Sequence, residues 1–194
     1  MLYWHQKGEI TVQLLVTRHG ETDFNCQNRY AGSTDVPLNA QGREQAVALA
    51  EKLAEEHFDI VVTSPLIRAR KTAEIVLQGR NIPLIFNENF RERNMGAFEG
   101  LTRAEAKAQH PDAWAHMATR SPDTAPPDGE SVRDFDARVA QGLAQLGAAY
   151  GERQVLLVCH GFVSRVINRQ LTGLTFESMH SFLLENCQVA VYTL

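Results

Sequence analysis

The chain has 194 residues, 44% hydrophobic and 22% charged, a size and composition that suit one sizeable core. The formal net charge of -4 gives no strong basic balance, so neither nucleic acid nor an anionic membrane is expected as the main partner. Three cysteines without CxxC spacing indicate reduced thiols and favour the cytoplasm, and no apolar run reaches transmembrane length. We expect a single domain over residues 1–194, with residues 1–10 as a lead-in that lacks the apolar stretch of a signal peptide.

The first predicted element is a buried strand over residues 13–17, which ends in the polar sequence Arg18-His19-Gly20-Glu21-Thr22. Residues 21–38 show no clean hydrophobic period and are predicted to form a loop over the end of that strand. Asn39 can cap a helix that continues to about residue 55. The short apolar run 59–63 then suits a second buried strand.

The next helix is predicted to begin at Ser64-Pro65, with Ser64 as its N-cap and Arg68 in its first turn. Residues 82–86 are typical of a strand, and Pro83 favours a place at the edge of the sheet. Beyond them the charged loop 90–96 opens with an apolar anchor, Phe90.

A weakly helical stretch, residues 102–118, is broken at Pro111, and three prolines make residues 121–129 a loop. Residues 101–130, approximately, are therefore predicted to form a cap or loop segment. Ser131 has the spacing of a capping box before a helix that runs to about residue 150.

The last predicted elements are a buried strand, residues 155–159, a helix that follows His160-Gly161, and an alternating terminal strand over residues 188–194. Strands and helices alternate along the whole chain. This order predicts an α/β fold, a three-layer sandwich with a mainly parallel central sheet.

Three polar groups follow predicted strands: Arg18-His19, Arg68 and His160-Gly161. Because the carboxyl ends of parallel strands meet at one edge of a sheet, we expect these residues to surround a single pocket. Guanidinium groups bind phosphate oxygens in bidentate fashion, and a neutral imidazole is a competent nucleophile. The pattern therefore favours phosphoryl chemistry, in which one histidine attacks and the other stabilises.

Glu92 is the candidate proton donor for the leaving oxygen, provided that its loop reaches the pocket. The flanking Arg91 and Arg93 argue against this role because they tend to keep the carboxylate ionised. Burial on substrate binding would reverse that effect. The alternative is that Glu92 is a salt-bridge partner of one of these arginines.

The first motif comprises residues 15–22, Leu15-Val16-Thr17-Arg18-His19-Gly20-Glu21-Thr22, and Asn25, Arg29, Gly32 and residues 35–38 that follow. This motif resembles the opening signature of the histidine phosphatase superfamily, the phosphoglycerate mutase-like family. Four later segments resemble family motifs in the same order: Thr63-Ser64-Pro65-Leu66-Ile67-Arg68-Ala69, Arg91-Glu92-Arg93-Asn94-Met95-Gly96, Gly129-Glu130-Ser131 and Val158-Cys159-His160-Gly161. The resemblance covers residues 12–194, approximately, and implies a phosphoglycerate mutase-like fold.

The resemblance implies that His19 becomes phosphohistidine while Arg18, Arg68 and His160 hold the phosphoryl oxygens. Glu92 would donate the proton and later activate water. The implied substrate contacts are Asn25, Arg29, Gly32, Arg93, Gly161 and Phe162. The resemblance implies neither a metal nor a cofactor, and the expected partner is a small phosphorylated metabolite.

The chain departs from the mutases of this family in ways that favour a phosphatase. Met95 stands where mutases carry Tyr, and Phe162 replaces a polar Asn. The chain also stops at Leu194, without the tail that covers a mutase site, and an uncovered phosphohistidine meets water. A phosphoglycerate mutase primed by a bisphosphorylated cofactor is the first alternative, and an inactive module that binds phosphorylated ligands or protein partners is the second.

Several residues keep two interpretations at this stage. Arg29 and Arg93 contact either a second anionic group or solvent, and Phe98, Trp114 and Met117 either shape a pocket or pack in the core. His19 and His160 alone would suit surface or capping histidines. His110 and His116 have no metal-binding spacing, and no role is assigned to His5, His57 or His180. The substrate remains open among sugar bisphosphates, phosphoglycerate, α-ribazole phosphate and phosphoproteins, as does the oligomeric state.

Overall fold

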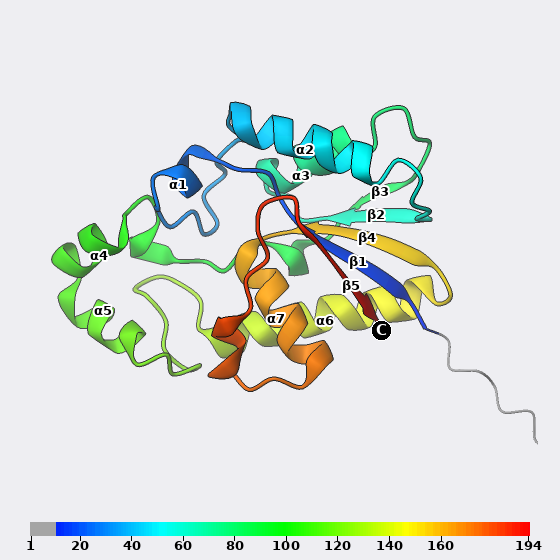
Figure 1. Ribbon diagram of the computed structural model, residues 1–194. Helices are drawn as coiled ribbons and strands as arrows, with labels where there is room; N and C mark the ends of the chain where they lie inside the picture. The colour runs from blue at the N-terminus through cyan, green and yellow to red at the C-terminus, as the bar shows by residue number, and fades with distance from the viewer. Residues whose placement is uncertain (1–10) are drawn as a thin grey trace, which may run out of the picture.

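The computed structural model describes residues 11–194 and is built on a five-stranded sheet (Figure 1). The predicted lead-in, residues 1–10, lies outside these residues. The strands are β1 (Gln13–Arg18), β2 (Ile60–Thr63), β3 (Leu84–Phe86), β4 (Gln154–Cys159) and β5 (Val189–Thr193). Their order across the sheet is β3-β2-β4-β1-β5, and every neighbouring pair is parallel except β1 with β5.

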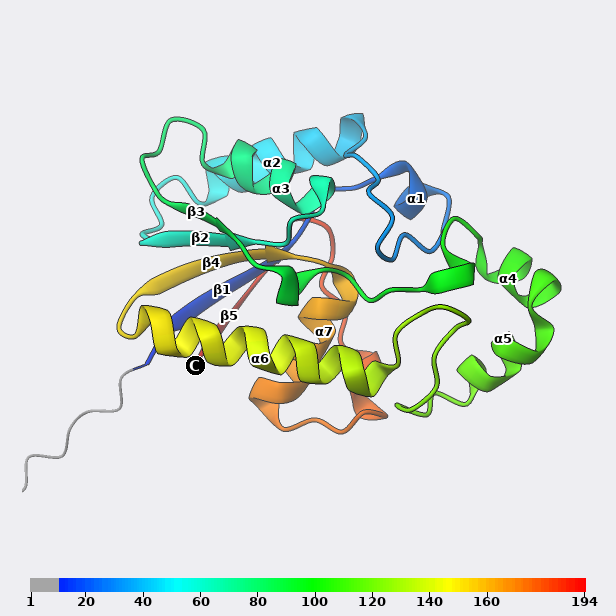
Figure 2. The same ribbon diagram turned by 180° about the vertical axis from the view of Figure 1, so that it is seen from behind.

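Helices cover both faces of this sheet (Figures 1 and 2). α2 (Ala40–Lys52) and α3 (Ile67–Val76) pack on one face, and α6 (Val132–Tyr150) and α7 (Gly161–Thr172) pack on the other. The central strand β4 sends Leu156 and Val158 into the first layer and Val155 and Leu157 into the second. Because successive side chains of a strand point to opposite faces, a strand buried on both faces is apolar throughout. The predicted three-layer α/β sandwich is confirmed.

Truncation of the central strand tests how much the sheet depends on this packing. Leu157 is fully buried between the sheet and the α6–α7 layer. We expect Leu157→Ala to lower the free energy of unfolding by about 2–5 kcal/mol, because it removes buried methyl groups and leaves a cavity. Urea denaturation followed by circular dichroism measures the change. A loss below about 1 kcal/mol would contradict close packing at this position.

The predicted cap segment lies beyond the end of the sheet (Figure 1). It contains α4 (Arg103–Gln109) and α5 (Pro111–Ala118), and Pro111 is the first residue of α5, which confirms the predicted break. Three short 3-10 helices, η1 (Glu88–Phe90), η2 (Gly96–Phe98) and η3 (Ser178–Ser181), complete the loops around this end. Within the described residues no helix has the length and apolar character needed to cross a membrane.

Two local predictions are wrong. The stretch 21–38 is not loop throughout, because Thr22 and Asn25 form a capping box that starts the one-turn helix α1 (Asp23–Cys26). Ser64 is not the N-cap of α3, which begins at Ile67 with Leu66 in the cap position and no side-chain cap. Asn39 and Ser131, in contrast, do cap α2 and α6 as predicted.

Candidate active site

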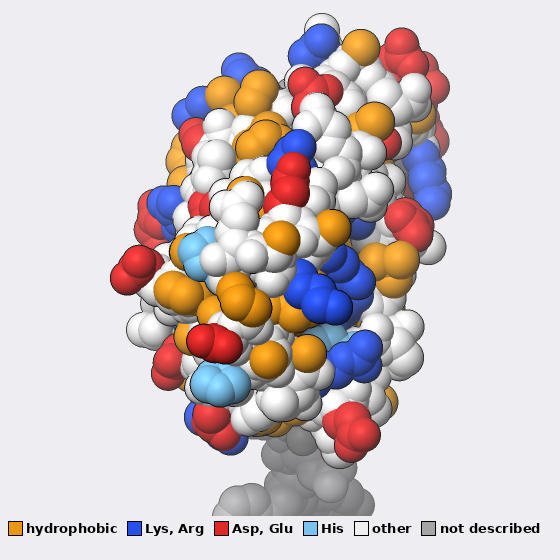
Figure 3. All heavy atoms as spheres, turned by 90° about the vertical axis from the view of Figure 1, so that its left-hand side faces the viewer, with side chains coloured by type: hydrophobic (Ala, Val, Ile, Leu, Met, Phe, Trp, Pro, Cys, Tyr) orange, Lys and Arg blue, Asp and Glu red, His pale blue; other side chains and the backbone are white. Residues whose placement is uncertain are grey.

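A cavity of about 630 Å³ lies between the carboxyl ends of β1, β2 and β4 and the cap helices α4 and α5. Figure 3 looks onto this end of the molecule, where basic and hydrophobic side chains gather near the middle of the face. Every predicted site residue lines the cavity except His160. His160 is fully buried beside the first histidine, and the ring centroids of His19 and His160 are 5.2 Å apart. The polar groups after the three strands therefore meet, as the sequence predicts.

His19 is buried and its ring is held in one orientation. Its Nδ1 atom lies 2.6 Å from the carbonyl oxygen of Gly20, so Nδ1 carries the hydrogen and donates it. Burial lowers the pKa of His19 well below its usual value, and the charges of Arg68 and Arg18 lower it further. The ring is therefore neutral at pH 7, with a free lone pair on Nε2 that can act as a nucleophile.

Backbone contacts fix this histidine at the end of β1. The His19 amide donates to the carbonyl of Cys159 on β4, and the Asn186 side chain donates to the carbonyl of His19 at 2.7 Å. The Gly20 amide donates to Thr72 on α3 at 3.0 Å. A side chain at Gly20 would collide with the Gly42 carbonyl of α2, which explains why glycine follows the histidine.

Arg68 comes from the first turn of α3 and is completely buried. Its Nη1 and Nη2 atoms donate to the carbonyls of Thr34 and Gly32, each at 2.8 Å. Gly32 has a φ of +49°, a left-handed backbone that glycine adopts readily, and this turn presents its carbonyl to Arg68. Arg18, at the end of β1, donates from Nη1 to the carbonyl of Leu184 at 3.3 Å.

His160 is oriented by Ser64, because His160 Nε2 lies 2.7 Å from the Ser64 hydroxyl oxygen. That oxygen already accepts a hydrogen bond from the Leu66 amide, so its own hydrogen can be donated to Nε2. The hydrogen of the neutral His160 ring then lies on Nδ1. Burial lowers the pKa of His160 well below its usual value, and the charge of Arg68 lowers it further.

Three buried nitrogen atoms around His19 have no hydrogen-bond partner among the described residues: Arg18 Nε, Arg68 Nε and His160 Nδ1. A buried donor without an acceptor is costly and unusual. Burial also lowers the pKa of both arginines, which is the cost of holding two cations away from water. An anion with several oxygen acceptors would satisfy all three donors and offset the two charges.

Glu92 reaches this cavity from the loop after η1. Its Oε1 atom accepts from the Arg93 amide at 2.9 Å, and its Oε2 atom accepts from the Phe162 amide at 3.2 Å, in the first turn of α7. Arg91 pairs with Glu88 instead. Among the described residues Glu92 forms no ion pair with either flanking arginine, so the salt-bridge alternative is not supported.

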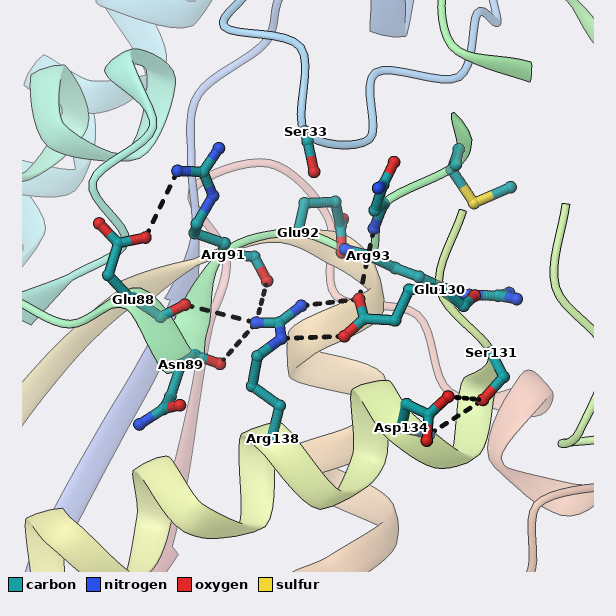
Figure 4. A network of polar contacts seen from close by, with 12 residues as sticks. Ser33, Glu88, Asn89, Arg91, Glu92, Arg93, Glu130, Ser131, Asp134 and Arg138 are labelled. Atoms are coloured by element: carbon teal, nitrogen blue, oxygen red, sulfur yellow. Dashed lines mark hydrogen bonds and ion pairs between the residues drawn. The ribbon is translucent and has the colours of Figure 1, made fainter. Parts of the chain in front are cut away.

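A partly buried ion pair holds the loop that carries Glu92 (Figure 4). Arg138 of α6 donates from Nε and Nη2 to the two carboxylate oxygens of Glu130, at 3.0 and 2.8 Å. Its Nη1 atom donates to three loop carbonyls, those of Glu88 at 3.4 Å, Asn89 at 2.9 Å and Arg91 at 3.1 Å. The Glu130 carbonyl accepts from Arg93 Nε at 2.9 Å. The Glu130 amide also donates to the carbonyl of Asn94 at 2.9 Å, so Arg138 and Glu130 hold the backbone on both sides of Glu92.

The remaining predicted contacts line the cavity but have other partners as well. Asn25 uses its Oδ1 atom to cap α1, and Arg29 pairs with Glu105 at 2.6 Å. Arg93 is buried, so its interpretation as a solvated charge is wrong. The cavity is also lined by Phe98, Trp114 and Met117, for which the sequence left a pocket or a core position open. Phe98 is in addition fully buried.

Sequence reasoning missed several residues of this cavity. They include Arg103, Arg120, Arg165, His180 and Leu183, all of which line it. Arg165 lies three residues beyond the predicted contact Phe162, and this helical spacing could have indicated that Arg165 faces the same cavity. Nothing in the local sequence indicates that His180 belongs to the site. Over residues 11–194, no three His, Cys, Asp or Glu side chains gather in a way that could hold a metal ion.

A sequence model of the histidine phosphatase superfamily (branch 1) matches residues 14–194. An uncharacterized phosphatase, PhoE, of Bacillus subtilis is 35% identical over 89% of this chain and 83% of its own. A 2,3-bisphosphoglycerate-dependent phosphoglycerate mutase of Gloeobacter violaceus is 31% identical over 90% of this chain and 82% of its own. The crystal structure of a putative α-ribazole-5'-P phosphatase from Escherichia coli superimposes with a TM-score of 0.89 at 28% identity, covering 94% of this chain and 90% of that one.

Proposed function

The chain belongs to the histidine phosphatase superfamily, and we propose that it is a phosphatase that hydrolyses a small phosphorylated metabolite through a phosphohistidine on His19. The observation that carries the proposal is the set of donors on Arg18, Arg68 and His160 that have no partner among the described residues and surround a neutral His19, whose Nδ1 is held by the Gly20 carbonyl. Named phosphatases among the relatives support the same reaction. Fold alone would not decide between the reactions of this superfamily.

In the first proposed step, His19 Nε2 attacks phosphorus and the ester P–O bond breaks. The leaving oxygen takes its proton from the protonated carboxyl group of Glu92, which faces the cavity beside the N-terminus of α7. Arg18 and Arg68 stabilise the charge on the transferring phosphoryl oxygens, and His160 Nδ1 donates to one of them. Two fixed guanidinium groups supply the charge stabilisation that a metal ion provides in other phosphatases.

In the second step, water attacks phosphorus and the P–N bond to His19 breaks. Glu92, now a carboxylate, accepts a proton from this water, and inorganic phosphate leaves. His19 returns to the neutral form in which the Gly20 carbonyl holds Nδ1. The protons balance, because the proton that Glu92 gives to the alcohol is recovered from water.

Phosphoglycerate mutase activity is the second candidate, because a relative named as a mutase matches over most of the chain. The two functions are separated by measuring phosphate release from a panel of phosphorylated metabolites in EDTA, beside conversion of 3-phosphoglycerate to 2-phosphoglycerate with and without 2,3-bisphosphoglycerate. We expect release without interconversion. Interconversion with little release would favour the mutase, and inactivity in both assays would favour a binding module.

The ion pair between Glu130 and Arg138 gives a prediction about the proton donor. Because it holds the backbone around Glu92, we expect Arg138→Gln to lower kcat/KM about tenfold for an alkyl phosphate, a part of the roughly 10²- to 10⁴-fold that general acid catalysis contributes. Hydrolysis of p-nitrophenyl phosphate should change much less, since p-nitrophenolate leaves without a proton. The ratio of the two kcat/KM values measures the effect.

The matched control is Arg133→Gln on the same helix. Arg133 also pairs with a carboxylate, that of Asp123, but this pair is exposed, and the side chain of Arg133 donates to Asp123 and not to the Glu92 loop. We expect its substrate ratio to equal that of the unmodified protein. An equal loss on both substrates in Arg138→Gln would mean that the ion pair acts on stability alone.

A further inference from the structure

The wall of the cavity carries basic side chains beyond those of the phosphoryl site. Arg103, Arg120 and Arg165 line it, and among the described residues none of the three forms an ion pair. Of all the residues that line the cavity, Glu92 is the one carboxylate. We have assigned that carboxylate to proton transfer, so the arginines of this wall lack an anion.

Arg165 lies against the ring of Phe162, and the charges of Arg103 and Arg120 are close enough to lower its pKa. The Arg165 and Arg93 guanidinium carbons are each 5.5 Å from the ring centroid, and the ring of His180 is 6.1 Å from it. Arg165 is half-buried, and its Nε atom donates to the carbonyl of Phe182 at 2.9 Å, so its position is fixed. Burial lowers the pKa of Arg165 and of His180, and the charges of Arg165 and Arg120 lower that of His180 further.

Like charges held together in a partly desolvated wall repel one another, and a bound anion relieves that repulsion. The phosphoryl group cannot be this anion, because it occupies the donors of Arg18, Arg68 and His160 behind it. The cavity is also lined by apolar side chains, among them Trp114, Met117 and Phe162. A ligand that matches both regions has an anion at each end and an apolar or flat part between them.

We propose that Arg103, Arg120 and Arg165 form a second anion subsite, and that the substrate is a phosphomonoester with a second acidic group beyond an apolar or flat spacer. This inference rests on the proposed phosphatase function. The second group is a carboxylate or a second phosphate, since guanidinium groups bind both.

Matched aryl phosphates test the subsite. The substrates are 4-(phosphonooxy)benzoate, its neutral benzamide analogue and 1,4-phenylene bisphosphate. We expect kcat/KM to be about ten- to a hundredfold higher for the benzoate than for the benzamide, because a hydrogen bond to a charged group contributes about 1.5–3 kcal/mol. The amide withdraws electrons more strongly than the carboxylate, so this preference cannot come from the leaving group. A higher value for the bisphosphate than for the benzoate would identify phosphate as the second group, and a lower value would identify carboxylate.

Variants locate the preference. Arg165→Gln should bring the ratio of kcat/KM for the benzoate to that for the benzamide close to one. Arg120→Gln, whose side chain is exposed, gives the same test without a risk to folding. Arg153→Gln is the control, because Arg153 is exposed and directly precedes β4. It therefore lies at the amino end of that strand, whereas the cavity lies at the carboxyl end. Equal kcat/KM values for benzoate and benzamide, or a preference that both pocket variants keep, would overturn the subsite while the phosphatase proposal stands. Failure to hydrolyse these substrates and p-nitrophenyl phosphate alike would overturn both.

Discussion

The His19→Ala variant is expected to lose kcat for p-nitrophenyl phosphate by about 10⁴-fold or more, the scale on which removal of a catalytic nucleophile acts. The reason is geometric: Nδ1 of His19 is held by the Gly20 carbonyl, burial keeps the ring neutral, and Nε2 is the atom left to attack phosphorus. Rapid acid-free quenching with ³²P-labelled substrate should trap label on the unmodified protein, and the variant should retain none. Both the rate and the trapped label are measured on the same preparations.

A histidine outside the cavity provides the control for this loss. His57 is exposed and pairs with Asp59 just before β2, so His57→Ala should keep full activity. His160→Ala should lose activity but retain some trapped label, because His160 is proposed to stabilise the phosphoryl group and not to attack it. If His19→Ala retained turnover while His160→Ala lost it, the roles assigned to the two histidines would be wrong.

The residues that meet at the sheet edge are predictable from sequence because their positions follow from local pattern. Arg18, Arg68 and His160 each come within a few residues of the end of a short apolar run, and parallel strands place those ends together. The apolar pattern determines where each strand ends. Once the sheet is predicted, the meeting of these three residues at its carboxyl end is therefore predicted as well. The α/β architecture follows from the same alternation of runs.

The partners of these residues are not predictable in the same way. Ser64 before Pro65 has the local pattern of an N-cap, yet its hydroxyl lies against His160, 96 positions away in the chain. Asn186 orients the His19 backbone from a loop whose sequence has no distinctive period. Such contacts depend on how two strands and their loops pack, and that information is not contained in either segment alone.

The arginines of the second subsite illustrate a further limit. Arg120 and Arg103 belong to a cap whose helices are weakly patterned, and in sequence they resemble solvated surface charges. Their proposed role becomes visible only in the folded protein, where both line the cavity and neither forms an ion pair among the described residues.

Arg68→Gln is expected to lower kcat by about 10²- to 10³-fold, as removal of one preorganised donor to a developing charge does in other enzymes. Arg68 is buried, its Nε faces no acceptor, and its two Nη atoms are fixed by the carbonyls of Gly32 and Thr34. Its charge also lowers the pKa of His19, second to burial. Removing that charge raises the pKa of His19, so the acidic limb of the kcat/KM profile should move to higher pH.

Arg68→Lys separates the two effects. A lysine keeps the positive charge but lacks the planar fork that bonds two carbonyls and a phosphoryl oxygen together, so kcat should fall while the acidic limb stays near its original pH. Arg70→Gln, two residues along on the outer side of the same helix, should change neither quantity. Circular dichroism and urea denaturation verify that each variant is folded. If Arg68→Gln lowered kcat without moving the limb, the charge of Arg68 would not contribute to the low pKa of His19, and burial together with the charge of Arg18 would account for it.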